Sequence, residues 1–199
     1  MIMPKEKREI QKQDIMPLDV YIKNRKELRK NIVSFKKDRR IALGPYATFY
    51  FESYETMLAQ VQEMLYIEKG GDEQLKDELE AYNPLIPNGK ELTATLMFEI
   101  DNPVSRSAFL SKVGGIEEKV FIKIDGEIAK AVPEKDVDRT SADGKASSVQ
   151  FIHFELTDKQ IQKFKSKNID IELGIDHKDY SHTTKLSSEN INSLSADFN

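Results

Sequence analysis

Three histidines have the clearest potential for chemistry, and all three fall in the C-terminal quarter of the chain. His177 and His182 flank a short turn in the stretch DHKDYSH, and a hairpin there would bring them close together. Asp176 and His153 are the further candidate ligands. Neutral imidazoles with a carboxylate suit zinc, iron or manganese, and an open position on such an ion activates water. The sequence therefore predicts a divalent metal site here, with hydrogen-bonded turn histidines as the alternative.

A second candidate site is the polar loop at residues 134–147, EKDVDRTSADGKAS, which is long for a compact domain. Its acidic residues do not match a calcium-binding EF-hand loop, because Ser141 and Ser147 stand where that loop needs Gly and Glu. An anion would instead find charged donors and hydroxyls in Arg139, Thr140, Ser141 and Lys145. The alternative is an ordinary surface loop.

Glu68 is the third candidate, as a carboxylate with a perturbed pKa. It falls near the middle of the apolar stripe of a predicted helix over residues 52–68. If it is buried and unpaired, its pKa is raised, which suits a general acid or base. If the helix has already ended, the carboxylate meets solvent or a basic residue such as Arg40.

Several classes of enzyme lack their signatures in this sequence. Without cysteine there is no disulfide, thiolate metal site or cysteine nucleophile. No G-x-S-x-G elbow, G-x-G-x-x-G turn or phosphate-binding Lys-Ser/Thr loop occurs, and the predicted helices contain no Glu-x-x-His pair. The sequence thus offers no complete catalytic set.

The elements that must position these residues follow from hydrophobic periodicity. The helix over residues 52–68 carries the strongest stripe and is expected to be the centre of the fold, with a second helix over 72–82. Alternation predicts strands over 41–52, 92–100, 149–156, 169–175 and 182–186, and Asp125-Gly126 predicts a hairpin turn. We therefore expect one α+β domain, with a largely antiparallel sheet of about six or seven strands packed by a helical pair.

Charge is unevenly distributed along the chain. The net charge is −4, yet residues 1–40 hold 13 basic and 6 acidic residues. A long basic helix is predicted over residues 14–38, and it is expected to dock on the acidic body of its own chain or of a second copy. Nucleic-acid binding by this helix is an alternative, but Tyr21 and Phe35 fall on its apolar side rather than among the basic residues.

The chain is expected to divide into a flexible N-terminus at 1–13, a basic helical arm at 14–40, a core at 41–187 and a polar tail at 188–199. No apolar run approaches the length of about 18 residues that a membrane span needs. Residues 1–10 are charged, unlike a signal peptide. We therefore expect a cytoplasmic protein.

Four stretches resemble, in order and spacing, an uncharacterised bacterial family, the domain of unknown function number thirty-five hundred and one. They are RRIALGPYATFYFE, QVQEMLYIE, EAYNPLIPNGKELTATLMFE and IELGIDHKDY, and the resemblance runs from about Asp14 to about Leu186. It implies no activity, ligand or catalytic residue. It does imply a setting, because genes of this family are often found near those of rubrerythrin-like proteins and iron-sulfur oxidoreductases.

These observations favour a non-catalytic accessory or interaction protein of a bacterial redox or peroxide-defence system. Its expected partner is another protein, such as a rubrerythrin-like protein or an iron-sulfur oxidoreductase. The alternatives are a metal-binding protein or metal-dependent enzyme that uses the C-terminal histidines, and a nucleic-acid-binding protein.

Overall fold

The structure is a computed structural model that describes residues 8–134, 140–141, 144–166 and 169–198. Within these residues, nine strands form two antiparallel sheets. Sheet A has the order β1 (Arg40–Leu43), β2 (Ala47–Phe51), β3 (Glu91–Phe98), β7 (Val149–Glu155) and β6 (Val132–Pro133). Sheet B has the order β5 (Glu127–Lys130), β4 (Val120–Ile124), β8 (Ile171–His177) and β9 (Tyr180–Lys185). The predicted α+β class is confirmed, but the strands divide between two sheets instead of forming one.

A single chain segment joins the two sheets along one side. After the turn at Asp125 and Gly126, both of which have positive φ, β5 pairs with β4 of sheet B. Two residues later β6 pairs with β7 of sheet A. On the other side, the Tyr180 hydroxyl of β9 donates to the Leu43 carbonyl at 2.5 Å, next to β2. The sheets are therefore held together along both sides.

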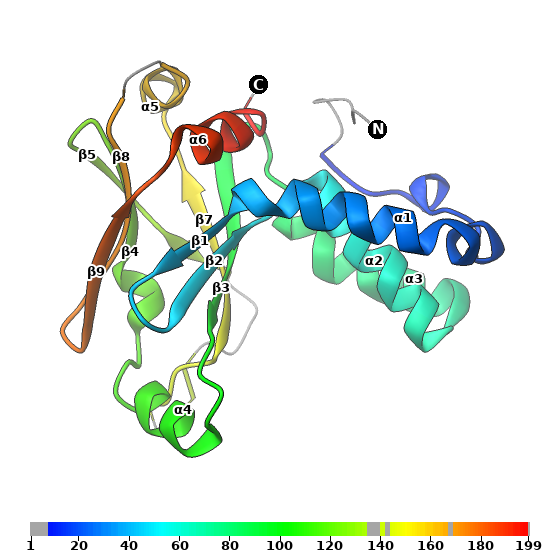
Figure 1. Cartoon of the computed structure of the whole chain (residues 1–199), viewed down its shortest axis with the longest axis horizontal. Coiled ribbons are helices and arrows are strands. Elements are labelled where there is room, and N and C mark those ends of the chain that lie inside the picture. The colour runs from blue at the N-terminus through cyan, green and yellow to red at the C-terminus, as the bar shows by residue number, and fades with distance from the viewer. Residues whose placement is uncertain (1–7, 135–139, 142–143, 167–168, 199) are drawn as a thin grey trace.

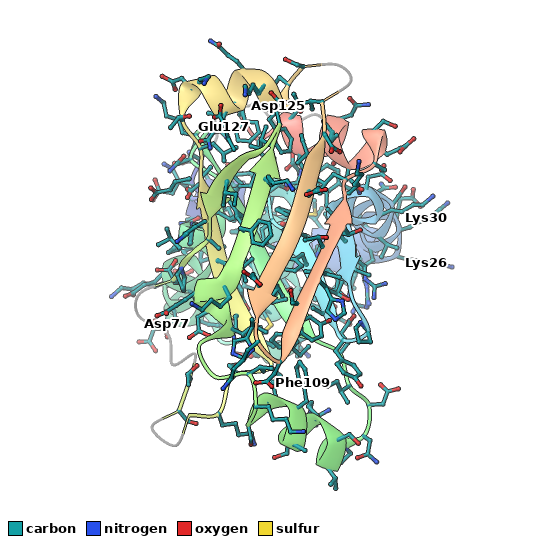
Figure 2. All side chains as sticks on the ribbon, turned by 90° about the vertical axis from the view of Figure 1, so that its left-hand side faces the viewer. Lys26, Lys30, Asp77, Phe109, Asp125 and Glu127 are labelled. Atoms are coloured by element: carbon teal, nitrogen blue, oxygen red, sulfur yellow. The ribbon has the colours of Figure 1, made fainter. Side chains whose placement is uncertain are left out.

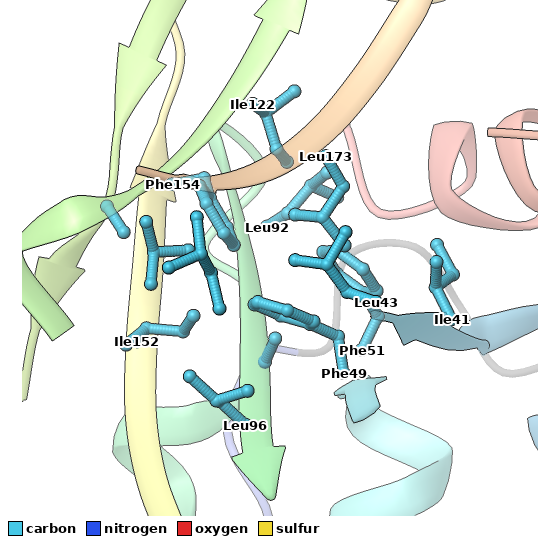
Figure 3. Packing of buried hydrophobic residues seen from close by; sticks show 14 of the residues in the cluster. Ile41, Leu43, Phe49, Phe51, Leu92, Leu96, Ile122, Ile152, Phe154 and Leu173 are labelled. Atoms are coloured by element: carbon cyan, nitrogen blue, oxygen red, sulfur yellow. The ribbon is translucent and has the colours of Figure 1, made fainter. Parts of the chain in front are cut away.

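The main hydrophobic core lies between the sheets, where Figure 3 shows side chains from both sheets in one cluster. Alternation explains this, because every second residue of a strand points to the same face. Sheet A contributes Phe49, Phe51, Leu92, Leu96, Ile152 and Phe154, and sheet B contributes Ile122, Ile124, Leu173 and Ile175; each is at most 1% exposed.

Three helices form a further layer on the side of sheet A that faces away from sheet B (Figure 1). They are α1 (Leu18–Lys36), α2 (Tyr54–Glu68) and α3 (Gly71–Tyr82), with α2 in contact with both neighbours. The short helices α4 (Pro103–Leu110), α5 (Asp158–Phe164) and α6 (Ser188–Ser195) lie at the two ends of the sheets. Short 3-10 helices occupy Lys12–Asp14, Lys37–Arg39, Asn83–Leu85 and Ile116–Lys119.

Helix α2 begins at Ser53, whose side chain accepts a hydrogen bond from the Thr56 backbone N–H. Its apolar stripe is confirmed, but it serves a second hydrophobic cluster rather than the main core. That cluster also holds Ile10 from the N-terminal segment, and it comprises Ile10, Tyr54, Met57, Val61, Leu75, Leu85 and Ile86. The helix expected at the centre of the fold is therefore the middle of a separate helical layer.

Three local features differ from the sequence-based expectations. The segment 41–52, where Gly44 and Pro45 indicate a break or bulge before the regular part of the strand, forms a hairpin, since Gly44 turns the chain at a φ of +64° between β1 and β2. Within the N-terminal segment expected to be flexible, Ile10 is 1% exposed, and its backbone N–H donates to the Asn83 side chain at 2.8 Å. The polar tail forms α6 and places Leu194 and Phe198 in the main core.

Arg39 fixes this C-terminal segment in place. Its guanidinium is 2% exposed, pairs with the Asp197 carboxylate at 2.5 Å and donates to the backbone oxygens of Phe51, Glu52 and Ser193. Burial raises the pKa of the Asp197 carboxyl, and the charge of Arg39 opposes that shift. No helix within the described residues combines the length and apolar character that crossing a membrane requires.

Candidate functional site

The densest group of titratable side chains lies on the outer face of sheet A, which points away from sheet B. Alternation in β3 and β7 turns apolar residues inward, so Glu91, Thr95 and His153 point outward. Glu52 follows β2 directly and Glu99 follows β3 directly. These five residues come from three neighbouring strands and build three small hydrogen-bonded clusters on one sheet face.

His153 is at the centre of the first cluster. Its Nδ1 lies 3.0 Å from Glu91 Oε2, and its Nε2 lies 2.8 Å from Glu134 Oε2. The hydrogen bond with Glu91, joined by the bond with Glu134, raises the pKa of the imidazole against the effect of burial. Both ring nitrogens thus donate to carboxylates, which favours the imidazolium form. The imidazolium of His153 then lies between the carboxylates of Glu91 and Glu134.

Glu52 forms the second cluster, with threonine hydroxyls instead of a cation. Thr95 Oγ1 donates to Glu52 Oε1 at 2.7 Å, and Thr56 Oγ1 donates to Glu52 Oε2 at 2.6 Å. The residue is 6% exposed and lies where β2 leads into α2. Its carboxylate oxygens therefore fasten the first turn of α2 to the centre of the sheet.

Glu99 forms the third cluster, at the solvent boundary. It accepts hydrogen bonds from the Thr48 hydroxyl at 2.5 Å and the Tyr50 hydroxyl at 2.7 Å, and it pairs with Arg40 at 3.2 Å. The hydrogen bond from Thr48, followed by that from Tyr50, lowers the pKa of the Glu99 carboxyl. Burial, followed by the bond to Glu99, raises the pKa of Tyr50.

In all three clusters the titratable side chains are bonded to partners within the chain. A general base must be able to reach a proton of the substrate, and a metal ligand needs its lone pair directed at the ion. Here both nitrogens of His153 and the carboxylates of Glu52 and Glu99 already have partners within the chain. The Glu52 cluster connects α2 to sheet A, and the other two clusters connect neighbouring strands of sheet A.

Of the residues on this face, only His153 was expected from the sequence as a site residue. The strand that holds Thr95 was expected from its alternation over residues 92–100. Nothing in the sequence indicated that β2 and β7 would lie on either side of β3, because the paired residues are far apart along the chain, as with Glu91 and His153 at 62 positions.

The predicted metal ligands are distributed over different faces. The expected hairpin forms, and His177 pairs across it with Tyr180 rather than with His182. The ring of Tyr180 packs edge-on against His182 at 4.5 Å between centroids, while His177 Nδ1 accepts from the Asp179 backbone N–H. His153 lies on sheet A with its two carboxylates. The structure does not bring the three imidazoles together.

Asp176 points to the opposite face of sheet B from His177, and it lines an open hollow of about 410 Å³ there. The floor of the hollow includes Phe121, whose ring covers Gly174 of the neighbouring strand. Among the described residues, no three His, Cys, Asp or Glu side chains gather as metal ligands. The metal site stays a prediction, and elemental analysis of the wild-type and His177→Ala proteins tests it.

Three of the four predicted anion-binding donors already have hydrogen-bond partners within the described residues. Arg139 lies outside the described residues. The Thr140 hydroxyl donates to the Glu117 carboxylate at 3.2 Å, the Ser141 hydroxyl donates to the Lys145 carbonyl, and the Lys145 ammonium donates to the Ser107 hydroxyl. The carboxylate beside Thr140 is unfavourable for an anion. Anion binding by this loop also stays a prediction.

Glu68 is exposed, whereas the sequence placed it on the apolar stripe. It is the last residue of α2, is exposed, and accepts a hydrogen bond from the Gln74 side chain at 3.2 Å. The apolar stripe ends before it because Lys69, with φ of 56°, ends the helix in a left-handed conformation. Glu68 therefore lies at the exposed end of the helix and not on its apolar stripe.

Only some of the basic residues of α1 contact α2. Arg25 donates two hydrogen bonds to the Glu63 carboxylate and forms an ion pair with it. Arg29 lies 3.6 Å from the same carboxylate, and the Tyr21 hydroxyl donates to it at 2.7 Å. The hydrogen bond from Arg25 lowers the pKa of Glu63, whereas burial, followed by the bond to Glu63, raises the pKa of Tyr21 to about 12. The lysines of α1 take no part in this contact.

Comparisons with known proteins agree with the fold and with the resemblance seen in the sequence. The family model described as Protein of unknown function (DUF3501) matches residues 9–198. A crystal structure described as a novel protein of unknown function from Burkholderia pseudomallei K96243 is similar, with 33% sequence identity and a TM-score of 0.89. That similarity covers 96% of this chain and 99% of the other. Comparison with curated proteins finds no match.

Proposed function

This chain belongs to the family described as Protein of unknown function (DUF3501), and we propose that it is an accessory interaction protein that binds a partner protein through helix α1. The proposal rests on what α1 leaves exposed. The clusters on sheet A bond their chemistry-bearing groups to one another, whereas α1 presents side chains that its own chain does not cover.

One observation carries the proposal. Helix α1 is 19 residues long, and Tyr21 is its only buried residue. Ten large hydrophobic side chains are exposed among the described residues, and five of them lie on this helix: Leu18, Val20, Ile22, Val33 and Phe35. Single exposed apolar residues are common on protein surfaces, but their concentration on one element marks an interaction surface.

Three of these residues form a stripe along one flank of the helix, which we call the apolar flank of α1. Leu18, Ile22 and Val33 fall within about 60° of one another on a helical wheel, with exposures of 39%, 52% and 68%. A helix that presents apolar residues on one side is recognised by a hydrophobic groove on a partner. Arg29 and Lys36 fall within the same sector of the wheel, and Lys26 lies next to it. We therefore assign the partner a groove that also carries acidic residues.

The family resemblance supports a redox or peroxide-defence setting for this partner. Rubrerythrin-like proteins and iron-sulfur oxidoreductases are the partners it suggests, and they provide the first proteins to test. The exposed apolar residues of α1 support the choice of binding element, and the resemblance supports the choice of partner.

The purified full chain is titrated with a rubrerythrin-like protein and, separately, with an iron-sulfur oxidoreductase from the same organism. Calorimetry measures the affinity of each complex. The double variant Ile22→Ser/Val33→Ser removes the centre of the apolar flank. Truncating central interface residues costs about 2 kcal/mol or more of binding free energy, so we expect binding to weaken at least about thirtyfold.

The matched control is Val104→Ser, which changes a side chain on α4 that is 76% exposed. We expect this variant to bind as the wild type does. Binding that the flank variant leaves intact would show that α1 is not the binding element. No complex with either partner at micromolar concentrations would count against the redox setting.

A further inference from the structure

A different face of α1, opposite the buried Tyr21, carries three lysines. Lys23, Lys26 and Lys30 fall within about 60° of one another on a helical wheel. All three are exposed, and none forms a hydrogen bond or ion pair with the described residues. We call them the lysine ridge. They are spaced three and then four residues apart, so the ridge is about 10 Å long.

Helix α3 carries the opposite pattern on its own exposed face. Glu73, Asp77 and Glu80 are exposed and lie opposite the buried Leu75, and within the described part of the chain they too have no partner. We call them the acidic ridge. Their spacing is four and then three residues, which is the reverse of the lysine ridge and gives the same length of about 10 Å.

The charges of the two helices also balance. Helix α1 contains six basic and two acidic residues, and α3 contains five acidic and one basic residue. The ridges cannot meet within one molecule, because α2 lies between the two helices. Figure 2 shows Lys26 and Lys30 at one side of the molecule and Asp77 at the other. Each ridge therefore faces solvent with its charges unneutralised.

We propose that a second copy of this chain docks its acidic ridge on the lysine ridge, with the two helices antiparallel. In this register Lys23 faces Glu80, Lys26 faces Asp77, and Lys30 faces Glu73 of the second copy. A parallel arrangement cannot match all three pairs. The lysines are spaced three and then four residues apart, whereas in the same chain direction the acidic residues are spaced four and then three residues apart. The antiparallel direction is thus fixed by the sequence positions of the charges.

The contact is heterologous, because each copy contributes a different surface. The ridges lie on opposite sides of the helical layer, so a docked copy still presents one free lysine ridge and one free acidic ridge. Association accordingly continues beyond a dimer unless a ring closes. Exposed ion pairs are weak and screened by salt, so this association requires high protein concentration and low ionic strength.

Charge reversal in two complementary variants tests this proposal. One is Lys26→Glu/Lys30→Glu and the other is Glu73→Lys/Asp77→Lys, both at exposed positions without partners in the described chain. Sedimentation velocity over a series of concentrations, at about 0.05 M and about 0.5 M salt, measures association, and circular dichroism checks the fold. We expect the wild type to associate at low salt only and each variant alone to be monomeric.

An equal mixture of the two variants is expected to associate again at low salt, because every junction regains opposite charges. For the register, Lys23→Glu is expected to associate with Glu80→Lys more strongly than with Glu73→Lys. A wild type that is monomeric at low salt at every concentration, or a mixture that does not associate, would overturn the proposal. Lys26 lies beside the apolar flank, so the two proposals are separated with Glu73→Lys/Asp77→Lys, which leaves α1 unchanged and should bind the partner as the wild type does.

Discussion

The outer face of sheet A and the exposed faces of α1 differ in whether their side chains have partners within the chain. On sheet A, Glu52, Glu99 and His153 are bonded to partners in the same chain. On α1, Lys26 and Lys30 have no partner within the described residues, and Val33 is 68% exposed. Groups that are satisfied internally stabilise the fold, whereas groups left open are available to another molecule.

The largest effect is expected for the buried ion pair that closes the C-terminus over sheet A. Replacing Arg39 with Ala leaves the Asp197 carboxylate buried without its cation, which costs about 3–5 kcal/mol of unfolding free energy. Urea denaturation measures this loss. Arg40→Ala is the control, because that side chain is 56% exposed and an exposed ion pair contributes about 1 kcal/mol or less. Equal effects of the two variants would remove the distinction between the buried and exposed pairs.

The next largest effect is expected at His153. His153→Ala leaves two carboxylates without their shared donor, at a cost of about 1–3 kcal/mol. The wild-type contribution also depends on pH, because the pKa of His153 is raised above its ordinary value of 6.5 in the folded state. It is fully present below pH 6.5 and is lost as pH rises through the folded pKa.

Unfolding free energies of the wild type and of His153→Ala, measured from pH 5 to 9, separate this effect from the others. We expect the difference between the two proteins to shrink as pH rises. A difference that stays constant over this range would mean that the imidazole does not gain a proton on folding.

A smaller effect is expected at Glu99, which has a side chain 42% exposed. The pKa of Glu99 is lowered in the folded state, so its contribution is present above the ordinary value of 4.5 and is lost as pH falls through the folded pKa. Solvent screening limits this contribution to about 1 kcal/mol. Thermal unfolding of Glu99→Gln at neutral and acidic pH measures it, and a larger loss at acidic than at neutral pH would contradict the assignment.

The smallest effect on stability is expected on α1 itself. Replacing Ile22 and Val33 with Ser changes side chains that are 52% and 68% exposed, so unfolding should shift by about 0.5 kcal/mol or less per residue. The same urea titration measures it. A loss of several kcal/mol would mean that the apolar flank supports the fold and is not kept for a partner.

The sequence predicted what depends on local periodicity. Alternation identified most strands, Asp125 and Gly126 identified the hairpin turn, and the stripe of α2 identified a packed helix. The division into two sheets was not predictable in this way. Strand β5 pairs with β4 of one sheet, whereas β6, which follows β5 almost directly, pairs with β7 of the other sheet. Long-range pairing is not encoded in a local period.

The site was less predictable than the fold for the same reason. His177 and His182 were correctly expected to flank a hairpin. The pairing register of β8 with β9 sets Tyr180, and not His182, opposite His177, and the amino-acid composition does not determine this register. Arg39 and Asp197 are 158 residues apart, and no local pattern links them. The basic character of α1, in contrast, was visible in the sequence, and the structure adds the exposure of the lysine ridge and its separation from the acidic ridge by α2.

One paired measurement tests the central claim most directly, namely that groups with partners inside the chain stabilise the fold while the open groups of α1 bind a partner. Urea denaturation and calorimetric titration with the partner are run on Arg39→Ala and on Ile22→Ser/Val33→Ser. The account predicts that the first variant loses several kcal/mol of unfolding free energy and that the second keeps its stability and loses binding. A second variant that is as unstable as the first, or that binds as the wild type does, would contradict it.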